Sequence, residues 1–202
     1  NSKQDPFHTP DPEAMRYDGK RKQLIWSSEG ERIVRTGAVV LEDPSVNIIS
    51  TEGKYIDSFG LPLHLHMHQT QNGPRQNGVF EGLSFVGNYK KLFVSVEEPL
   101  FEDGPRAGLK DSSGWIRIIK FDVKTRKPGR QFAYQIDSVA YPANPPGSFK
   151  INGVPDILAI NDHQLLIIER SFSTGRKPCT IKVYLAELNG ASDVSNISSL
   201  LN

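Results

Sequence analysis

Acidic residues recur in register along this chain and are its best candidates for chemistry. Three segments share one pattern: an acid, an alternating apolar run, a turn, a second apolar run and another acid. The first acids are Glu13, Glu81 and Asp156, and the second acids are Glu29, Glu97 and Glu169. The two acids of a segment are 16, 16 and 13 residues apart. Because ordinary surface acids need not recur in this way, the repetition favours a functional role.

Carboxylates that converge on one place repel one another unless protons or a cation neutralise them. A hard cation suits carboxylate and carbonyl oxygens, which favours Ca²⁺ over other divalent ions. We therefore expect Glu13, Glu81 and Asp156 to form a metal site. The second acids, at the other end of each hairpin or one strand over, would add ligands or structure. The alternative is that the repeated acids are structural and accept hydrogen bonds from backbone amides.

The sequence contains none of the motifs that indicate a side-chain nucleophile or a nucleotide-binding loop. It has no G-x-S-x-G segment and no glycine-rich phosphate loop, and its only cysteine, Cys179, follows Pro178 without an evident base nearby in sequence. This pattern favours attack by water assisted by a metal ion over covalent catalysis. Paired acids are also able to act as a general base.

Two arginines are candidates for binding an anionic ester substrate, because a guanidinium holds phosphate through two parallel hydrogen bonds. Arg170 follows Glu169 directly, and Arg75 precedes Glu81 by six residues. The alternative is that both are solvated and balance nearby acids.

Three histidines form a second, weaker metal candidate. His64, His66 and His68 alternate with Leu65 and Met67, so an extended strand would place the three imidazoles on one face. Such a face suits Zn²⁺, Cu²⁺ or Ni²⁺. The polar stretch that follows favours the alternative of exposed loop histidines.

Strands are the elements that must position these residues. The runs 24–26, 92–96 and 165–168 are continuously apolar, which predicts strands covered on both faces. Further runs rich in β-branched and aromatic residues lie at 33–41, 45–50, 115–122, 131–137 and 180–188. No segment has a convincing amphipathic helical pattern. The sequence therefore predicts an all-β protein.

About four strands per unit of roughly 70 residues is the layout of a β-propeller blade. We expect residues 1–202 to form one β-propeller-like domain of about three four-stranded blades, incomplete at its C-terminal end. A ring needs at least about four blades to close. Either the chain is part of a longer protein, or self-association with partner chains completes the ring.

Composition limits the partners. The formal net charge is +1, which argues against nucleic acid as a partner. Hydrophobic residues make up 37% of the chain, enough for a packed core, and no apolar run is long enough to span a membrane. We therefore expect a soluble protein without membrane insertion, and the sequence does not open with a signal peptide.

The repeated motifs resemble those of the phytase-like family, also described by an esterase-like activity of phytase. The first two pairs are DPEAMRYD with LIWSSEGE and NGVFEGLSF with LFVSVEEPL. The third pair is VPDILAI with LLIIERSF, and IKVYLAEL closes the resemblance. It extends over nearly the whole chain, and the middle motif is the most specific.

The resemblance implies a bacterial, commonly exported, β-propeller-like protein whose acids hold calcium and hydrolyse phosphate or other esters. It implies Glu13, Glu81 and Asp156 as metal ligands and Glu81, Glu97 and Glu169 as catalytic acids. It also places the protein outside the cytoplasm, in the periplasm or secreted. Two alternatives remain at this point. One is a non-catalytic propeller that presents its long loops to a glycan, peptide or envelope partner, and the other is a metal that only stabilises the ring.

Overall fold

The structure, a computed structural model, describes residues 11–110, 114–175 and 179–201. Within these ranges the only helical elements are two short 3-10 turns, η1 (Leu63–Leu65) and η2 (Phe101–Asp103). None of the described helical segments has the length and apolar character to cross a membrane. The predicted all-β class is confirmed.

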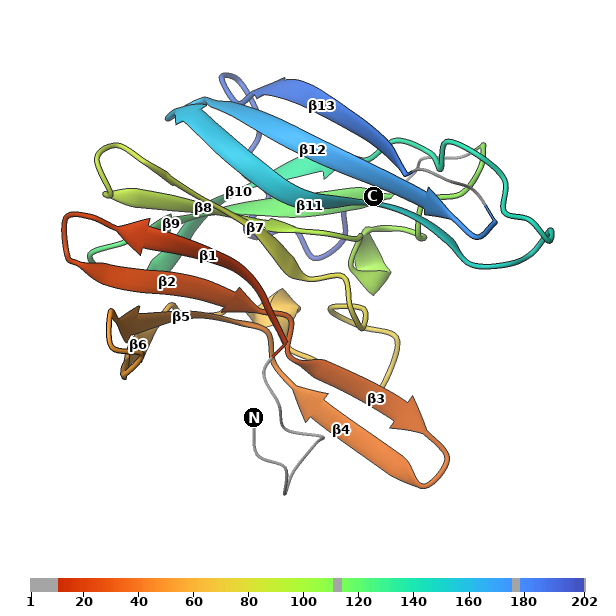
Figure 1. The fold of residues 1–202 in the computed structure, drawn as a ribbon, viewed down its shortest axis with the longest axis horizontal. Helices are drawn as coiled ribbons and strands as arrows, with labels where there is room; N and C mark the ends of the chain where they lie inside the picture. The colour runs from red at the N-terminus through yellow and green to blue at the C-terminus, as the bar shows by residue number, and fades with distance from the viewer. Residues whose placement is uncertain (1–10, 111–113, 176–178, 202) are drawn as a thin grey trace.

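The described strands form four antiparallel sheets (Figure 1). The first sheet has the order β1 (Pro12–Asp18), β2 (Gln23–Ser28), β5 (Ser45–Ser50) and β6 (Tyr55–Ser58). The second has the order β10 (Lys127–Gln135), β9 (Trp115–Asp122), β8 (Lys91–Val96) and β7 (Phe80–Val86). The third has the order β11 (Lys150–Asn161), β12 (Gln164–Ser173) and β13 (Thr180–Glu187). Strands β3 (Glu31–Arg35) and β4 (Ala38–Glu42) form a separate hairpin that projects from the rest.

The predicted strands at 45–50 and 115–122 have the observed bounds of β5 and β9. The predicted run 33–41 is wrong as a single strand, because it contains the turn between β3 and β4. Gly37 in this turn has a φ of 82°, a left-handed conformation that glycine adopts without strain.

The first strand of each predicted hairpin, namely β1, β7 and β11, lies next to the first strand of a neighbouring sheet (Figure 1). The backbone N–H of Ala159 on β11 donates to Oγ of Ser84 on β7 at 2.8 Å. The two strands approach closely at Gly82, where a Cβ atom would lie 2.9 Å from the backbone nitrogen of Ile157. These strands are therefore brought side by side from distant parts of the sequence.

Two apolar cores join the sheets. The first packs Ile25 and Ile48 of the first sheet with Leu83 and Val94 of the second. The second core contains Phe93 and Ile118 of the second sheet together with Val154, Ile157, Leu165 and Ile167 of the third. The middle sheet is thus buried on both of its faces.

The prediction of strands covered on both faces holds for β8, whose residues from Leu92 to Val96 are all buried. It is wrong for β12, where Leu165 and Ile167 are buried but Leu166 and Ile168 are only partly so. The face of the third sheet that points away from the second is exposed and apolar. Its most exposed members are Leu158, Ile181, Val183 and Leu185.

Candidate metal and acid-base site

A cavity of about 450 Å³ opens where the first two hairpins begin and end. It is lined by acidic, polar and apolar residues of all three hairpins and their flanking segments. The polar lining residues are Asp11, Glu13, Glu29, Asn77, Glu81, Glu97 and Arg170, and the others are Phe149, Ile151, Phe172 and Cys179.

Glu13 and Glu81 reach the cavity because each lies in a β-bulge. The β1–β2 register shifts between Pro12 and Met15, which encloses Glu13, and the β7–β8 register shifts between Phe80 and Gly82, which encloses Glu81. A bulge bends the strand and changes the direction of its side chains.

The second acids lie at the same end of each hairpin as the first and one strand over, so the expectation of one strand over is confirmed and that of the other end is wrong. The backbone N–H of Glu29 donates to the carbonyl of Asp11 at 3.1 Å, and that of Glu97 donates to the carbonyl of Val79 at 2.7 Å. In an antiparallel hairpin the start of the first strand faces the end of the second. Both acids of a hairpin therefore meet at one edge.

Glu29 and Glu97 reach toward the sheet that follows their own. The backbone N–H of Val79, directly before β7, donates to the Glu29 carboxylate at 2.6 Å. Glu97 lies against β11, because a Cβ atom on Gly153 would stand 2.8 Å from Cγ of Glu97. Glu29 is 3% exposed and Glu97 is 4% exposed. These carboxyl groups are therefore almost fully desolvated.

Desolvation changes the proton affinity of these acids. Burial raises the pKa of Glu29 to about 7, although the hydrogen bond from Val79 opposes the rise. Burial also raises the pKa of Glu81 to about 8, and the negative charges of Glu97 and Glu13 add to the rise.

The pKa values of Glu97 and Glu13 are raised as well. Burial and then the charge of Glu98 raise the pKa of Glu97 to about 7, and the positive charge of Arg170 opposes this. Burial and then the charge of Asp11 raise the pKa of Glu13. Near neutral pH this cluster therefore changes its charge readily, and a bound cation would relieve its repulsion.

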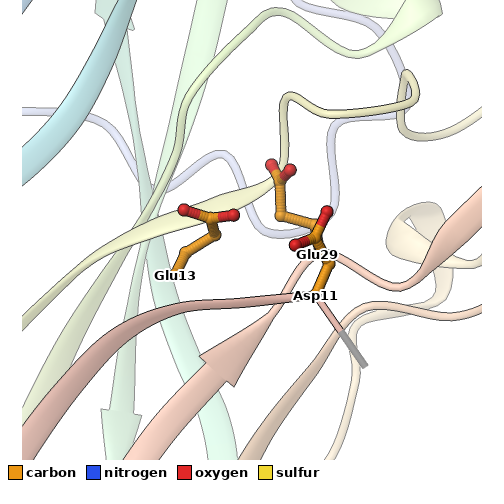
Figure 2. Close-up of side chains that lie close together, drawn as sticks. All are labelled: Asp11, Glu13 and Glu29. Carbon is orange, nitrogen blue, oxygen red and sulfur yellow. The ribbon is translucent and has the colours of Figure 1, made fainter. Parts of the chain in front are cut away.

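Two overlapping groups of acids fit one divalent cation each. Asp11, Glu13 and Glu29 form the first group, and Glu29, Glu81 and Glu97 form the second. Within each group, one oxygen from every carboxylate lies within 4.8 Å of the others. Ligand oxygens of Ca²⁺ lie at about 2.3 to 2.6 Å from the ion, so two ligands of one ion are at most about 5 Å apart. Figure 2 shows the carboxylates of the first group turned toward one another.

The structure does not bring Asp156 to Glu13 and Glu81. Its two carboxylate oxygens accept hydrogen bonds from Nη2 of Arg16 on β1 at 2.7 and 2.8 Å. The Asp156 side chain is 42% exposed, and it does not line the cavity.

A one-residue difference in strand register explains the position of Asp156. The residues directly before the second acids pair across the hairpins as Ser28 with Pro12, Val96 with Phe80 and Ile168 with Asp156. In the first two hairpins the first acid therefore follows the paired residue, whereas in the third it is the paired residue itself. A slip of one residue turns a side chain to the opposite face of a strand.

Glu169 is buried but likewise does not line the cavity. It turns back toward the second sheet, where its carboxylate accepts hydrogen bonds from the Tyr134 hydroxyl at 2.7 Å and the Asp137 amide at 3.1 Å. The Asn152 side chain donates a third at 2.6 Å. Glu169 therefore matches the structural alternative for the repeated acids, with donors that satisfy its buried charge.

Of the two candidate arginines, one lines the cavity and the other does not. Arg170 lines the cavity and donates to the Glu97 carboxylate at 3.2 Å. Arg75 instead donates to the carbonyls of Pro99 and Gly104 at 2.9 and 2.7 Å and stacks on Phe101. The structure thus gives Arg75 a role in holding a loop and leaves Arg170 at the cavity.

The three histidines do not share an extended face. Leu63–Leu65 is a 3-10 turn and not a strand, so the alternating histidines are not placed on one face of an extended strand. His64 contacts the side chain of Gln131 at 2.9 Å, and His66 contacts Asp43 at 2.6 Å. Among the described residues, no group with metal-ligand spacing contains a histidine.

Sequence reasoning did not single out Asp11, Phe149, Ile151 or Phe172, which also line the cavity. A signal existed for Asp11, which precedes Glu13 by two residues and so shares its face on an extended strand. No local signal marks the apolar residues, because Ile151 and Phe172 meet only through the pairing of β11 with β12.

Comparison with known protein families gives a match over the whole chain. A family model described as phytase-like, esterase-like activity of phytase, matches residues 1–202. No curated protein matches the chain. The family match includes all three hairpins and the segments that line the cavity.

Proposed function

Because this chain belongs to the phytase-like family, we propose that it hydrolyses a phosphate ester or another small ester with the help of a bound divalent cation. The family itself points to a hydrolase acting on phosphate esters. The observation that carries the proposal is the convergence of five acids and one arginine on a single cavity of about 450 Å³.

The first group of acids, Asp11, Glu13 and Glu29, is the proposed cation site. Ca²⁺ is the first choice, because its flexible coordination accepts carboxylates in irregular arrangements. When bound, such an ion polarises the ester and lowers the pKa of water. This assignment leaves Glu81 and Glu97 next to the ion for proton transfer.

Water is the proposed nucleophile. Its oxygen forms the new bond to phosphorus while the bond from phosphorus to the alcohol oxygen breaks. Glu97, which accepts a hydrogen bond from Arg170 and has a pKa raised by burial to about 7, would accept the proton from water. Glu81, with its pKa raised to about 8, would donate a proton to the alcohol that leaves. Arg170 would also hold the anionic group of the substrate.

A chelation experiment tests this function. The chain is treated with EDTA, and hydrolysis of p-nitrophenyl phosphate and p-nitrophenyl acetate is measured before and after Ca²⁺, Mg²⁺ or Mn²⁺ is added back. We expect hydrolysis to depend on the added ion. Anomalous scattering from a calcium-soaked crystal would locate the ion among Asp11, Glu13 and Glu29. Hydrolysis that is equal with and without EDTA would contradict the metal-dependent function.

The proposal includes a propeller-like architecture for the single domain. Two observations support this architecture. The first three sheets pack face to face in chain order. The third sheet also has an exposed apolar face, which includes Val183 and Leu185, where a further sheet would pack. Another segment of a longer protein or a second copy would supply that sheet. The family resemblance supports action outside the cytoplasm, where calcium concentrations suit sites of low affinity.

A further inference from the structure

The cavity has two kinds of wall, and the second is not explained by hydrolysis alone. The acids come from the first two hairpins, whereas the third hairpin contributes Ile151 and Phe172 together with Arg170. Phe149, directly before β11, and Cys179, directly before β13, extend this second wall. The hairpin whose acids point elsewhere thus provides an apolar surface beside the carboxylates.

Two aromatic rings dominate the apolar wall. Phe149 is 56% exposed and Phe172 is 37% exposed, and their ring centroids lie 6.1 Å apart at an interplanar angle of 39°. Aromatic surface of this size is costly to leave in water and gains free energy when a ligand covers it. Its position inside an acidic cavity makes it suitable for the apolar part of a ligand whose charged part lies at Arg170.

The charge of the cavity limits the number of anionic groups in a ligand. Among the lining residues that the structure describes, Arg170 is the only cation, and five acids surround it. One arginine and one divalent ion can compensate one phosphate group. A polyol that carries many phosphates would place its other charges next to Glu97 and the other carboxylates of the cavity, where like charges repel.

We propose that the substrate joins one phosphate group to an aromatic or bulky apolar alcohol, and not to a multiply phosphorylated polyol. This inference rests on the proposed function and names its substrate class. The phosphate lies at Arg170 and the cation site, and the alcohol lies on Phe149 and Phe172. The apolar wall therefore determines which ester is accepted, while the acids of the first two hairpins carry out the hydrolysis.

A binding experiment tests the substrate class without requiring hydrolysis. Phenylphosphonate and methylphosphonate, which carry the same anionic group on a stable carbon–phosphorus bond, are titrated into the chain in the presence of Ca²⁺. We expect phenylphosphonate to bind about tenfold more tightly, because the rings of the wall cover its phenyl group. The double variant Phe149→Ser with Phe172→Ser should remove this preference and leave methylphosphonate binding unchanged.

The matched control is Tyr17→Ser, which removes an aromatic side chain 52% exposed on β1 and outside the cavity lining. It should leave the preference intact, and circular dichroism with thermal melting should show that all variants fold. Equal binding of the two phosphonates, or a preference that survives in the double variant, would overturn the inference. Tighter binding of inositol hexakisphosphate than of phenylphosphonate would overturn it as well.

Hydrolysis of benzyl phosphate and ethyl phosphate separates this inference from the proposed function. We expect the double variant to lower kcat/KM for benzyl phosphate about tenfold and to change that for ethyl phosphate little. If neither ester is hydrolysed but the phosphonate preference is found, the proposed function fails and the apolar binding wall stands. If both are hydrolysed but the double variant affects them equally, the function stands and the substrate class fails.

Discussion

Glu97 directly follows the second strand of its hairpin and Glu169 lies within the second strand of the next hairpin, yet their surroundings differ. Glu97 reaches forward to β11 and into the cavity, where Arg170 is its hydrogen-bond donor among the described residues. Glu169 reaches back to the second sheet, where Tyr134, Asn152 and the Asp137 amide satisfy it. Both are buried, so burial alone does not separate a functional acid from a structural one.

The number of donors around each carboxylate makes the difference. A buried carboxylate with several donors has its hydrogen-bonding capacity satisfied and stabilises the fold, whereas one among other acids has a raised pKa and is available for protons or a cation. The acids of the first two hairpins belong to the second kind. The third hairpin, in which the first acid is shifted by one residue in strand register, instead supplies the apolar wall and Arg170.

The largest effect that would sharpen this contrast is expected from Glu81→Gln. Loss of the proposed proton donor should lower kcat for phosphate ester hydrolysis by about 10²- to 10³-fold. The thermal stability in EDTA should not fall, because the substitution removes a carboxyl group whose ionisation burial and the neighbouring acids oppose. Steady-state kinetics and thermal melting measure the two effects. Undiminished kcat would remove Glu81 from the mechanism.

Calcium should act on the acids of the first two hairpins and not on Glu169. Ca²⁺ at about a hundred times its dissociation constant stabilises a protein by about 2.7 kcal/mol. For a chain of this length, that free energy raises Tm by about 5 to 10 °C. Glu29→Gln should abolish the increase and Glu169→Gln should retain it. An equal loss in both variants would break the contrast.

The pH dependence of this stabilisation follows from the raised pKa values. Without a divalent cation, Glu29, Glu81 and Glu97 hold protons more tightly when folded, with pKa values of about 7, 8 and 7, than at the ordinary value of 4.5. The unfolded state therefore binds fewer protons between about pH 4.5 and 8, and the free energy of unfolding falls as pH rises through this interval. Urea unfolding in EDTA at pH 5.5, 7 and 8 should show the fall, and calcium should reduce it. A free energy of unfolding that rises over the same interval would contradict the raised pKa values.

Glu169→Gln tests the structural side of the comparison. Three donors lose a charged acceptor in a buried position, so we expect the free energy of unfolding to fall by about 2 kcal/mol. The kcat of the folded fraction should remain close to that of the original chain. Denaturant unfolding and active-fraction kinetics distinguish this outcome from a catalytic role, in which kcat would fall while stability changed little.

Arg170→Ala should have a smaller effect, with the binding of the substrate changed most. Removal of the cation of the cavity should raise KM for an anionic ester about tenfold, since a charge-assisted hydrogen bond is lost. Arg16→Ala is the matched control, because its guanidinium binds the partly exposed Asp156 and not the cavity acids. A neutral ester should show little change in KM with either variant.

Asp156→Asn should have the smallest effect. Its ion pair with Arg16 joins two partly exposed side chains, 42% and 34% exposed, and such pairs contribute at most about 1 kcal/mol. We expect hydrolysis and calcium stabilisation to remain unchanged. A loss of calcium binding would restore Asp156 to the metal site and would break the distinction between the hairpins.

Several features of this protein were predictable from its sequence. Alternating apolar residues predicted the strands of each hairpin, and β5 and β9 have the expected bounds. The repetition of acids correctly indicated a cluster that contains Glu13 and Glu81. It did so because each of these acids lies near the start of a strand whose position the apolar pattern determines.

The exclusion of Asp156 and Glu169 was not predictable in the same way. The spacing of 13 residues in the third hairpin, where the other two have 16, differs by an odd number, but only the pairing of β11 with β12 shows which acid is displaced. The meeting of Phe149 and Phe172 with acids more than 50 residues away likewise depends on the packing of separate sheets.

The sequence by itself determined that this chain is all-β, that it belongs to the phytase-like family, and that acids begin and end its hairpins. The tertiary structure decided which of those acids share a cavity and which are satisfied by neighbouring donors. The physical reason is that alternation along a strand is a local property, whereas register and the packing of one sheet on another select the face that each side chain occupies.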